Sequence, residues 1–230
     1  MISLEERIQR LESLIRRISS DVKSETRVSL PARVTSFDPE KQTISCIPTI
    51  REMVNINGSV TYRDLPELRD VPIIVPRAGN WIVTLPIKAG DECMVIFQDL
   101  CIDGWWFRGG IQNWNDLRRH DLSDAIAIFS PWSQPNTVSS YSSDNLEIRS
   151  LDGSIHISLT TSGININAPQ GLNITGNVQV TGNVQVNGAI NSTDNIKSDA
   201  DVLAGSISLK NHTHNYNPGP GAPTPTGVPQ

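Results

Sequence analysis

The 230-residue chain contains few cysteines, few histidines and few aromatic residues, and it carries no excess of basic charge. Its three cysteines are an odd number without metal-type spacing, so we interpret Cys46, Cys93 and Cys101 as reduced core residues of a protein folded in cytoplasm. A formal net charge of −5 argues against a nucleic-acid groove, which requires a basic patch. No signal peptide is expected, and no apolar run is long enough to span a bilayer.

Aromatic residues are concentrated between residues 81 and 114, and beyond Tyr141 only Tyr216 is aromatic. A compact, aromatic-centred core is therefore expected only in the first two-thirds of the chain. The last third must bury its apolar side chains in another way.

Residues 1–24 carry a heptad pattern. Its apolar positions, which step alternately by four and three residues, are Leu4, Ile8, Leu11, Ile15, Ile18 and Val22. This period of 3.5 residues is typical of a coiled-coil seam. The alternative is an amphipathic helix packed on its own domain. Three heptads are short for independent stability, so the seam would assist an oligomer that is held together elsewhere.

Residues 25–129 form short apolar runs separated by turn signals. "ARVTSFDPEKQTISCIPTI" contains two alternating runs around Asp38-Pro39-Glu40, and "VPIIVPRAGNWIVTLPIKAGDECMVIFQD" continues in the same way. We interpret "GWWFRGG" as a buried aromatic strand closed by glycines, and no helix-forming run is expected in this part. About five strands with turn-rich spacing predict a small antiparallel barrel.

The same segments resemble a known family. In order from about Pro31 to Ile128, "PARVTSFDPEKQTISCIPTI", "VPIIVPRAGNWIVTLPIKAGDECMVIFQD", "IDGWWFRGG" and "RRHDLSDAIAI" are similar to the N-terminal domain of the membrane-puncturing central spike proteins of contractile-tailed bacteriophages. The resemblance implies an oligosaccharide/oligonucleotide-binding-type barrel that acts as a trimeric adaptor at the centre of the baseplate. The heptad segment lies outside this resemblance, and "NINGSVTYRDLPELRD" is a variable insert.

Residues 130–143 are predicted to be a linker, and residues 144–210 carry aliphatic residues at i and i+2. These are Leu146/Ile148, Ile155/Ile157/Leu159, Ile164/Ile166, Leu172/Ile174, Val178/Val180, Val184/Val186 and Ile207/Leu209. "TGNVQV" occurs twice in succession, so the internal repeat has six residues. A monomeric solenoid or a low-complexity stalk is the alternative. We predict an intertwined trimeric β-helix or prism, because three copies around one axis would bury these side chains against each other.

Residues 211–230 are predicted to form a metal-binding tip and a Pro/Gly-rich tail that turns back along the spike. If the strand of Ile207 simply continued, His212 and His214 would face outward, and a one-residue shift at Lys210-Asn211 would turn them to the axis. A threefold axis would then supply six histidine nitrogens, an octahedral site with no open position. The spikes resembled bind iron at a His-x-His tip, which implies one iron ion per trimer here. The alternative is that both histidines face solvent.

The other two histidines receive simpler interpretations: His120 takes part in a local salt bridge, and His156 points outward from its strand. No nucleophile elbow, phosphate loop or flanking carboxylate pair is present, so no enzymatic activity is expected.

Together these observations predict an all-β protein: an N-terminal helix, an oligosaccharide/oligonucleotide-binding-type barrel and a trimeric β-helix spike. The resemblance implies a homotrimeric virion protein at the distal end of the tail baseplate, assembled in the host cytoplasm. Its partners would be the baseplate hub protein and, transiently, the host outer membrane, with no nucleic acid and no small-molecule substrate. The alternative function is a trimeric glycan-binding adhesin or tail fibre. A trimeric hydrolase would need a carboxylate pair across chains.

Overall fold

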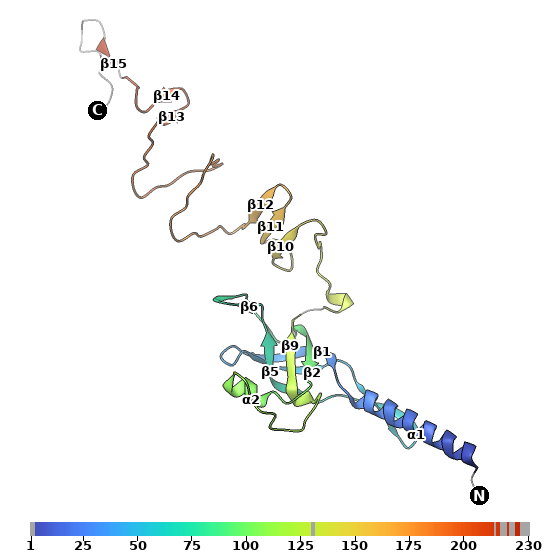
Figure 1. Ribbon diagram of the computed structural model, residues 1–230. Coiled ribbons are helices and arrows are strands. Elements are labelled where there is room, and N and C mark those ends of the chain that lie inside the picture. The colour runs from blue at the N-terminus through green and yellow to red at the C-terminus, as the bar shows by residue number, and fades with distance from the viewer. Residues whose placement is uncertain (1–2, 130–131, 214, 217–219, 221–223, 226–230) are drawn as a thin grey trace. The chain divides into compact units, whose positions relative to one another are not determined.

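The computed structural model describes residues 3–129, 132–213, 215–216, 220 and 224–225, and the chain is drawn in Figure 1. It divides into two compact units, Met1–Gln170 and Gly171–Gln230. No helix in the described part of the chain is both long and apolar enough to cross a lipid bilayer.

The predicted N-terminal helix is present as α1 (Leu4–Glu25). Ser3 caps it: its hydroxyl accepts a hydrogen bond from the backbone N–H of Glu6, and the Glu6 carboxylate accepts one from the backbone N–H of Ser3. This reciprocal capping box satisfies two backbone donors that the first turn would otherwise leave open. Acidic residues in the first turn and Lys23 in the last also complement the helix dipole.

Five strands close into a barrel (Figure 1). They are β1 (Ser29–Asp38), β2 (Thr43–Pro48), β5 (Leu68–Ile74), β8 (Glu92–Phe97) and β9 (Ala125–Ile128), in the order β1-β2-β5-β9-β8. The predicted barrel is confirmed, but the prediction of a wholly antiparallel one is wrong, because β5 and β9 run parallel. The reason is arithmetic: around a closed ring with an odd number of strands, directions cannot alternate at every step.

The barrel core consists mainly of small and branched aliphatic side chains. Its buried members are Ala32, Val34, Ile44, Cys46, Leu68, Val71, Cys93, Val95, Phe97, Ala125 and Ala127. The expectation of an aromatic-centred core is therefore wrong, since Phe97 is the one aromatic side chain among them. Five strands enclose a narrow interior that small side chains fill. Cys46 and Cys93 lie in the core as predicted, whereas Cys101 is only half-buried.

Short elements lie in the connections between the barrel strands. They are the hairpin β3 (Glu52–Ile56) and β4 (Ser59–Arg63), the pair β6 (Arg77–Ala78) and β7 (Trp81–Ile82), helix α2 (Asp103–Arg108) and the 3₁₀ turn η1 (Leu122–Asp124). The segment predicted to be a variable insert, residues 55–70, contains most of the β3–β4 hairpin and the first residues of β5. The hairpin turns at Asn57 and Gly58, which both have positive φ. Glu52 at its base accepts hydrogen bonds from Arg27 and Arg63.

The interpretation of "GWWFRGG" as a buried strand is wrong, because the segment forms α2. The backbone N–H of Trp106 donates to the carbonyl of Ile102, and Gly109, with φ +68°, ends the helix. Its aromatic side chains are not core residues, and that of Phe107 is 81% exposed. The barrel closes without this segment because β9 supplies the fifth strand.

Beyond the 3₁₀ turn η2 (Gln134–Asn136), a three-stranded antiparallel sheet follows the barrel in sequence. Its strands are β10 (Leu146–Arg149), β11 (His156–Thr160) and β12 (Gly163–Asn167). His156 alternates with Ile157 along β11, as predicted, and its ring is half-buried beside the buried Ser158. The preceding loop covers this face: the carbonyl of Gly153 lies 3.0 Å from His156 Nδ1, and that of Ser154 accepts a hydrogen bond from Asn167.

In the second unit the described strands are only two residues long. They pair as β13 (Leu203–Ala204) with β14 (Ile207–Ser208), and as β15 (Asn215–Tyr216) with β16 (Thr224–Pro225). Residues 168–202, all of them described, form no strand, so the alternative single-chain solenoid does not form there. The intertwined β-helix, which needs three chains, stays a prediction. The β15–β16 pairing shows that the tail turns back; its course along a spike stays a prediction.

Candidate functional site

The turn that precedes the predicted metal ligands is ordered by local hydrogen bonds. Strand β14 ends at Ser208, and the backbone N–H of His212 donates to the carbonyl of Ser208 at 3.0 Å. Because residues 209–211 form a turn, the strand of Ile207 does not continue to His212. The outward parity that a continuous strand would impose on His212 therefore does not apply.

Backbone carbonyls contact the ring of His212. Its Nδ1 lies 3.1 Å from the carbonyl oxygens of both Ser208 and Leu209. Carbonyl oxygens only accept hydrogen bonds, so these contacts favour a proton on Nδ1, and a neutral ring of that tautomer has its lone pair on Nε2. A histidine held by a carbonyl in this tautomer is typical of metal ligation through Nε2. His214, the second predicted ligand, lies outside the described residues.

Asp201 stabilises the same turn. One of its carboxylate oxygens accepts hydrogen bonds from the backbone N–H groups of Val202, at 2.8 Å, and Lys210, at 3.1 Å. The pKa of this carboxyl group is lowered, mainly by a hydrogen bond with the Ser208 hydroxyl. The two backbone hydrogen bonds lower it further. The base of the predicted tip is thus organised by charge-assisted hydrogen bonds.

The largest uncovered feature of the last third is its set of aliphatic side chains at i and i+2, which we call the aliphatic rows. Their side chains are 40–70% exposed. They comprise Leu146, Ile148, Ile155, Ile157, Leu159, Ile164, Ile166, Leu172, Ile174, Val178, Val180, Val184, Val186, Ile207 and Leu209. In β11 the polar residues are covered while Ile157 and Leu159 face solvent, which is the reverse of a strand packed in its own core. Exposed apolar rows of this extent are typical of surfaces that contact a partner, a membrane or a ligand.

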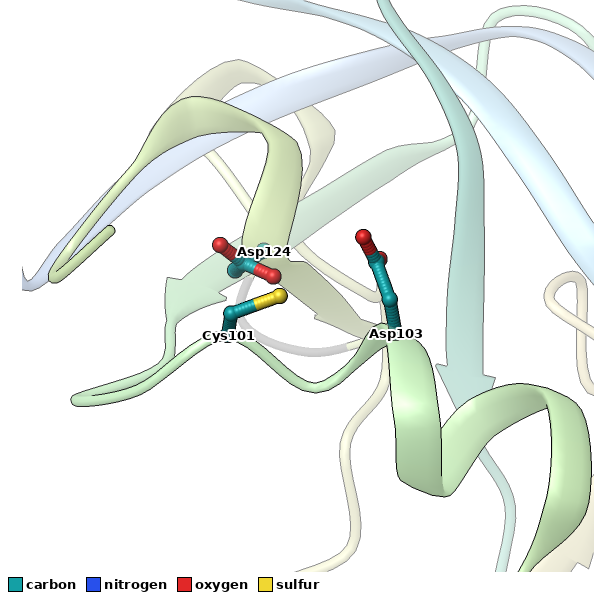
Figure 2. Close-up of side chains that lie close together, drawn as sticks. All are labelled: Cys101, Asp103 and Asp124. Atoms are coloured by element: carbon teal, nitrogen blue, oxygen red, sulfur yellow. The ribbon is translucent and has the colours of Figure 1, made fainter. Parts of the chain in front are cut away.

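At the barrel, Cys101, Asp103 and Asp124 bring their ligand atoms within 4.8 Å of one another (Figure 2). Arg118 already supplies a cation to this cluster: its Nη2 lies 2.8 Å from Cys101 Sγ and 2.7 Å from Asp103 Oδ2. Its Nε lies 3.3 Å from Asp124 Oδ2, and these anionic and polar neighbours, Cys101 first, raise the pKa of Arg118. The cluster therefore holds the guanidinium group and is structural.

Asp124 is the buried member of this cluster, with 1% of its side chain exposed. Its other carboxylate oxygen accepts a hydrogen bond from the backbone N–H of Ile102, which fixes the start of α2 against η1. Sequence reasoning missed the cluster, because its members are spread over residues 101–124 and only the fold brings them together. The one local signal was the charged run "RRHDLSD".

His120 and Arg119 lie beside this cluster. His120 Nε2 is 3.5 Å from Asp99 Oδ1, which agrees with the local salt bridge predicted for it. Arg119 also pairs with Asp99, at 3.0 Å, and its guanidinium group lies 5.0 Å from the ring centroid of Trp114. These contacts are exposed, and they suit a supporting role at the barrel surface.

Glu92, the first residue of β8, ties the linker to the barrel. Its carboxylate accepts hydrogen bonds from the backbone N–H and the hydroxyl of Ser133, each at 2.6 Å, and from Asn136 Nδ2 at 2.9 Å. The bonds from Ser133 are the main cause that lowers the pKa of Glu92. Further along, Arg149 donates to the carbonyls of Ser139 and Ser140. The predicted linker thus has defined attachment points.

Comparison with known proteins shows what the barrel is similar to. Residues 30–130 match the family model of the phage protein Gp138 N-terminal domain. The match extends from β1 through β9 and coincides with the segments that resemble spike proteins. It supports a bacteriophage structural protein, a component of the virion. No curated protein matches the chain.

Removal of the Arg118 charge should destabilise the barrel. In Arg118→Met the buried carboxylate of Asp124 loses its cation, and we expect the free energy of unfolding to fall by about 2–3 kcal/mol. This is less than for a fully buried pair, because Arg118 is 29% exposed. The neighbouring exposed pair provides the control, since Arg119→Met should cost about 0–1 kcal/mol. Chemical denaturation measures both. Equal losses, or a wild-type melting temperature that rises with added Zn²⁺, would contradict the structural role.

The linker attachment should depend on the charge of Glu92. Because the folded-state pKa of Glu92 lies below its ordinary value of 4.5, its stabilisation is present above that pH and is lost as pH falls through the folded pKa. Hydrogen exchange at residues 133–137, corrected for the intrinsic rate, should therefore accelerate in acid. Glu92→Gln should exchange fast already at neutral pH, whereas Glu40→Gln, in the β1–β2 turn, should behave as the wild type. A Glu92→Gln protein with unchanged exchange would disprove the attachment.

Proposed function

We propose that this chain is the central spike of a contractile phage tail, a homotrimer that pierces the host outer membrane during injection. One observation carries the proposal: a barrel that matches a phage protein domain is followed, in the same chain, by repeats whose aliphatic rows no described residue of that chain covers. The barrel, with its five-stranded closed order, would be the oligosaccharide/oligonucleotide-binding-type adaptor, attached to the baseplate hub protein.

The aliphatic rows support the trimer. Burying a Val, Leu or Ile side chain contributes about 1.5–3 kcal/mol, and each row carries two or three of them. Because residues 168–202 form no ladder within one chain, their backbone groups also need partners. Three chains around one axis would meet both needs at once, with row against row inside and Gly, Asn, Ser and Thr outside. Such a polar exterior suits a needle that crosses lipid without adhering to it.

The tip would be closed by metal. Imidazole nitrogens suit Fe²⁺, and the Nδ1 contacts of His212 favour the tautomer that ligates through Nε2. With His214, three chains would supply six nitrogens to one octahedral ion, which leaves no position for a substrate. The choice of iron rests on the resemblance to spike proteins. The ion would hold three strand ends together where fraying would otherwise begin.

The proposed mechanism is mechanical, with no catalytic step and no small-molecule substrate or nucleic-acid partner. Sheath contraction would supply the work, and a rigid trimer at the distal end of the baseplate would concentrate it on a small area of membrane. The contacts of Glu92 and Arg149 suit this task, because they stiffen the linker between barrel and repeats.

Metal content tests the proposal. Elemental analysis of tag-free protein should find one iron per three chains, and the ion should be lost in His212→Ala/His214→Ala. His156→Ala is the matched control and should keep its iron, because that ring lies in β11. Light scattering on the same samples should report a trimer. A monomeric wild type, or protein without stoichiometric metal, would contradict the trimer or the tip site, respectively.

A glycan-binding adhesin or fibre is the second candidate, and the exposed aromatic side chains around α2 favour it. Trp105, Phe107 and Trp114 offer ring faces on which sugars can stack. As a spike, the chain should bind no host surface glycan in a titration with purified lipopolysaccharide. Binding that disappears in Phe107→Ala/Trp114→Ala but persists in Trp81→Ala would favour the adhesin.

A further inference from the structure

Helix α1 presents an apolar face that nothing in the described part of the chain covers. Its aliphatic side chains are 47–71% exposed: Leu4, Ile8, Leu11, Leu14, Ile15, Ile18 and Val22. In proteins an amphipathic helix gains most of its stability from packing its apolar face rather than from intrinsic helix propensity. The capping box shows that the helix has a defined start, so the exposed face belongs to a formed helix.

The order of residues along this face specifies how a partner helix would pack. Ile8 and Ile15 take one core position of the heptad, and Leu4 and Leu11 take the other. Leu14 flanks the core and widens the apolar face beyond the two-position seam of a simple pair. The first two heptads, with Ile8 and Ile15 at one core position and Leu4 and Leu11 at the other, suit two strands, whereas the β-branched Ile18 and Val22 of the last heptad suit three. The number of strands proposed below therefore follows from the threefold axis of the proposed trimer.

Charges beside the core fit a copy of the same helix. Arg7 directly precedes the core residue Ile8, and Glu12 directly follows Leu11. In a parallel, in-register coiled coil these two flanking positions face each other across neighbouring chains, so each interface would pair Arg7 with Glu12 of the next chain. Within one helix the two residues are five apart and do not face each other. The opposite charges of Arg7 and Glu12 would therefore attract each other between copies of the helix and not within one helix.

We propose that α1 forms a parallel, in-register three-stranded coiled coil with the same helix of two further copies of this chain. The inference rests on the proposed trimer, because rotation about a threefold axis makes the three helices parallel and in register. The trimer is then held on both sides of the barrel in sequence, by α1 before it and by the aliphatic rows after it. The apolar face of α1 is an interface between copies and not a contact with the barrel.

Site-specific cross-linking of the full chain tests this arrangement. In Leu4→Cys the new thiols of neighbouring chains would lie side by side in the core, and a short bismaleimide should join them into covalent dimers on a denaturing gel. Ser13→Cys, on the opposite face of the helix, is the matched control and should give none. The wild type reports any background from Cys101, the half-buried native thiol.

A charge exchange at Arg7 and Glu12 tests the predicted pairing between copies in the same cross-linking assay. Glu12→Arg in the Leu4→Cys background would oppose Arg7 with a like charge and should reduce the cross-linked fraction. The exchange Arg7→Glu/Glu12→Arg should restore it, whereas Arg16→Glu, outside the core-flanking positions, should leave it unchanged. A helix that packed on another protein would show no such rescue.

Light scattering on the same samples separates this inference from the proposed function. A trimer that gives no cross-link at Leu4→Cys would overturn the coiled coil and leave the spike intact. A monomer would overturn both, and a cross-linked dimer would overturn the three-stranded coil and the spike. Cross-linking between Leu4→Cys and Val22→Cys chains, without linking of either alone, would indicate antiparallel pairing and so refute the proposal.

Discussion

This structure depends on the burial of aliphatic side chains. Among the described residues, a single chain achieves this burial in the closed barrel. There five strands fill a narrow interior with small side chains such as Val95 and Ala127. Before the barrel, α1 leaves its apolar face exposed, and after it the aliphatic rows do the same. One closed core thus lies, along the sequence, between two exposed apolar surfaces, which is the basis of the proposed trimer.

Polar contacts determine how the barrel presents the segments attached to it. Arg118 draws Cys101, Asp103 and Asp124 together and so fixes α2 against the end of the barrel. At another point Glu92 holds Ser133 of the linker. Both sites use charged groups, whose hydrogen bonds are shorter and stronger than neutral ones. They hold the attached segments against the barrel, which suits a structural component of a phage virion.

Much of the architecture is predictable from the sequence, since it arises from local periodicity. The heptad of residues 1–24 predicted α1, and the alternation from Arg27 onward predicted barrel strands. The barrel errors have non-local causes. The composition of "GWWFRGG" is typical of a strand, yet the segment forms α2, and the fifth strand of the barrel is β9, which comes later in the sequence. Likewise, no local sequence pattern indicates that β5 and β9 pair in parallel, because this follows from closing a ring of five strands. Of the predicted metal ligands, the structure describes His212, and its Nδ1 contacts with Ser208 and Leu209 come from a turn that sequence reasoning could only offer as one option.

The sequence alone determined which side chains alternate, repeat and remain uncovered, because periods of 2, 3.5 and 6 residues are properties of neighbours along the chain. Tertiary structure decided which strand closes the barrel, which cation fills the Cys101, Asp103 and Asp124 cluster, and which face of β11 is covered by its own loop. Those outcomes depend on contacts between residues far apart in sequence. Such contacts form only when the closed barrel and its loops fix the distances between them.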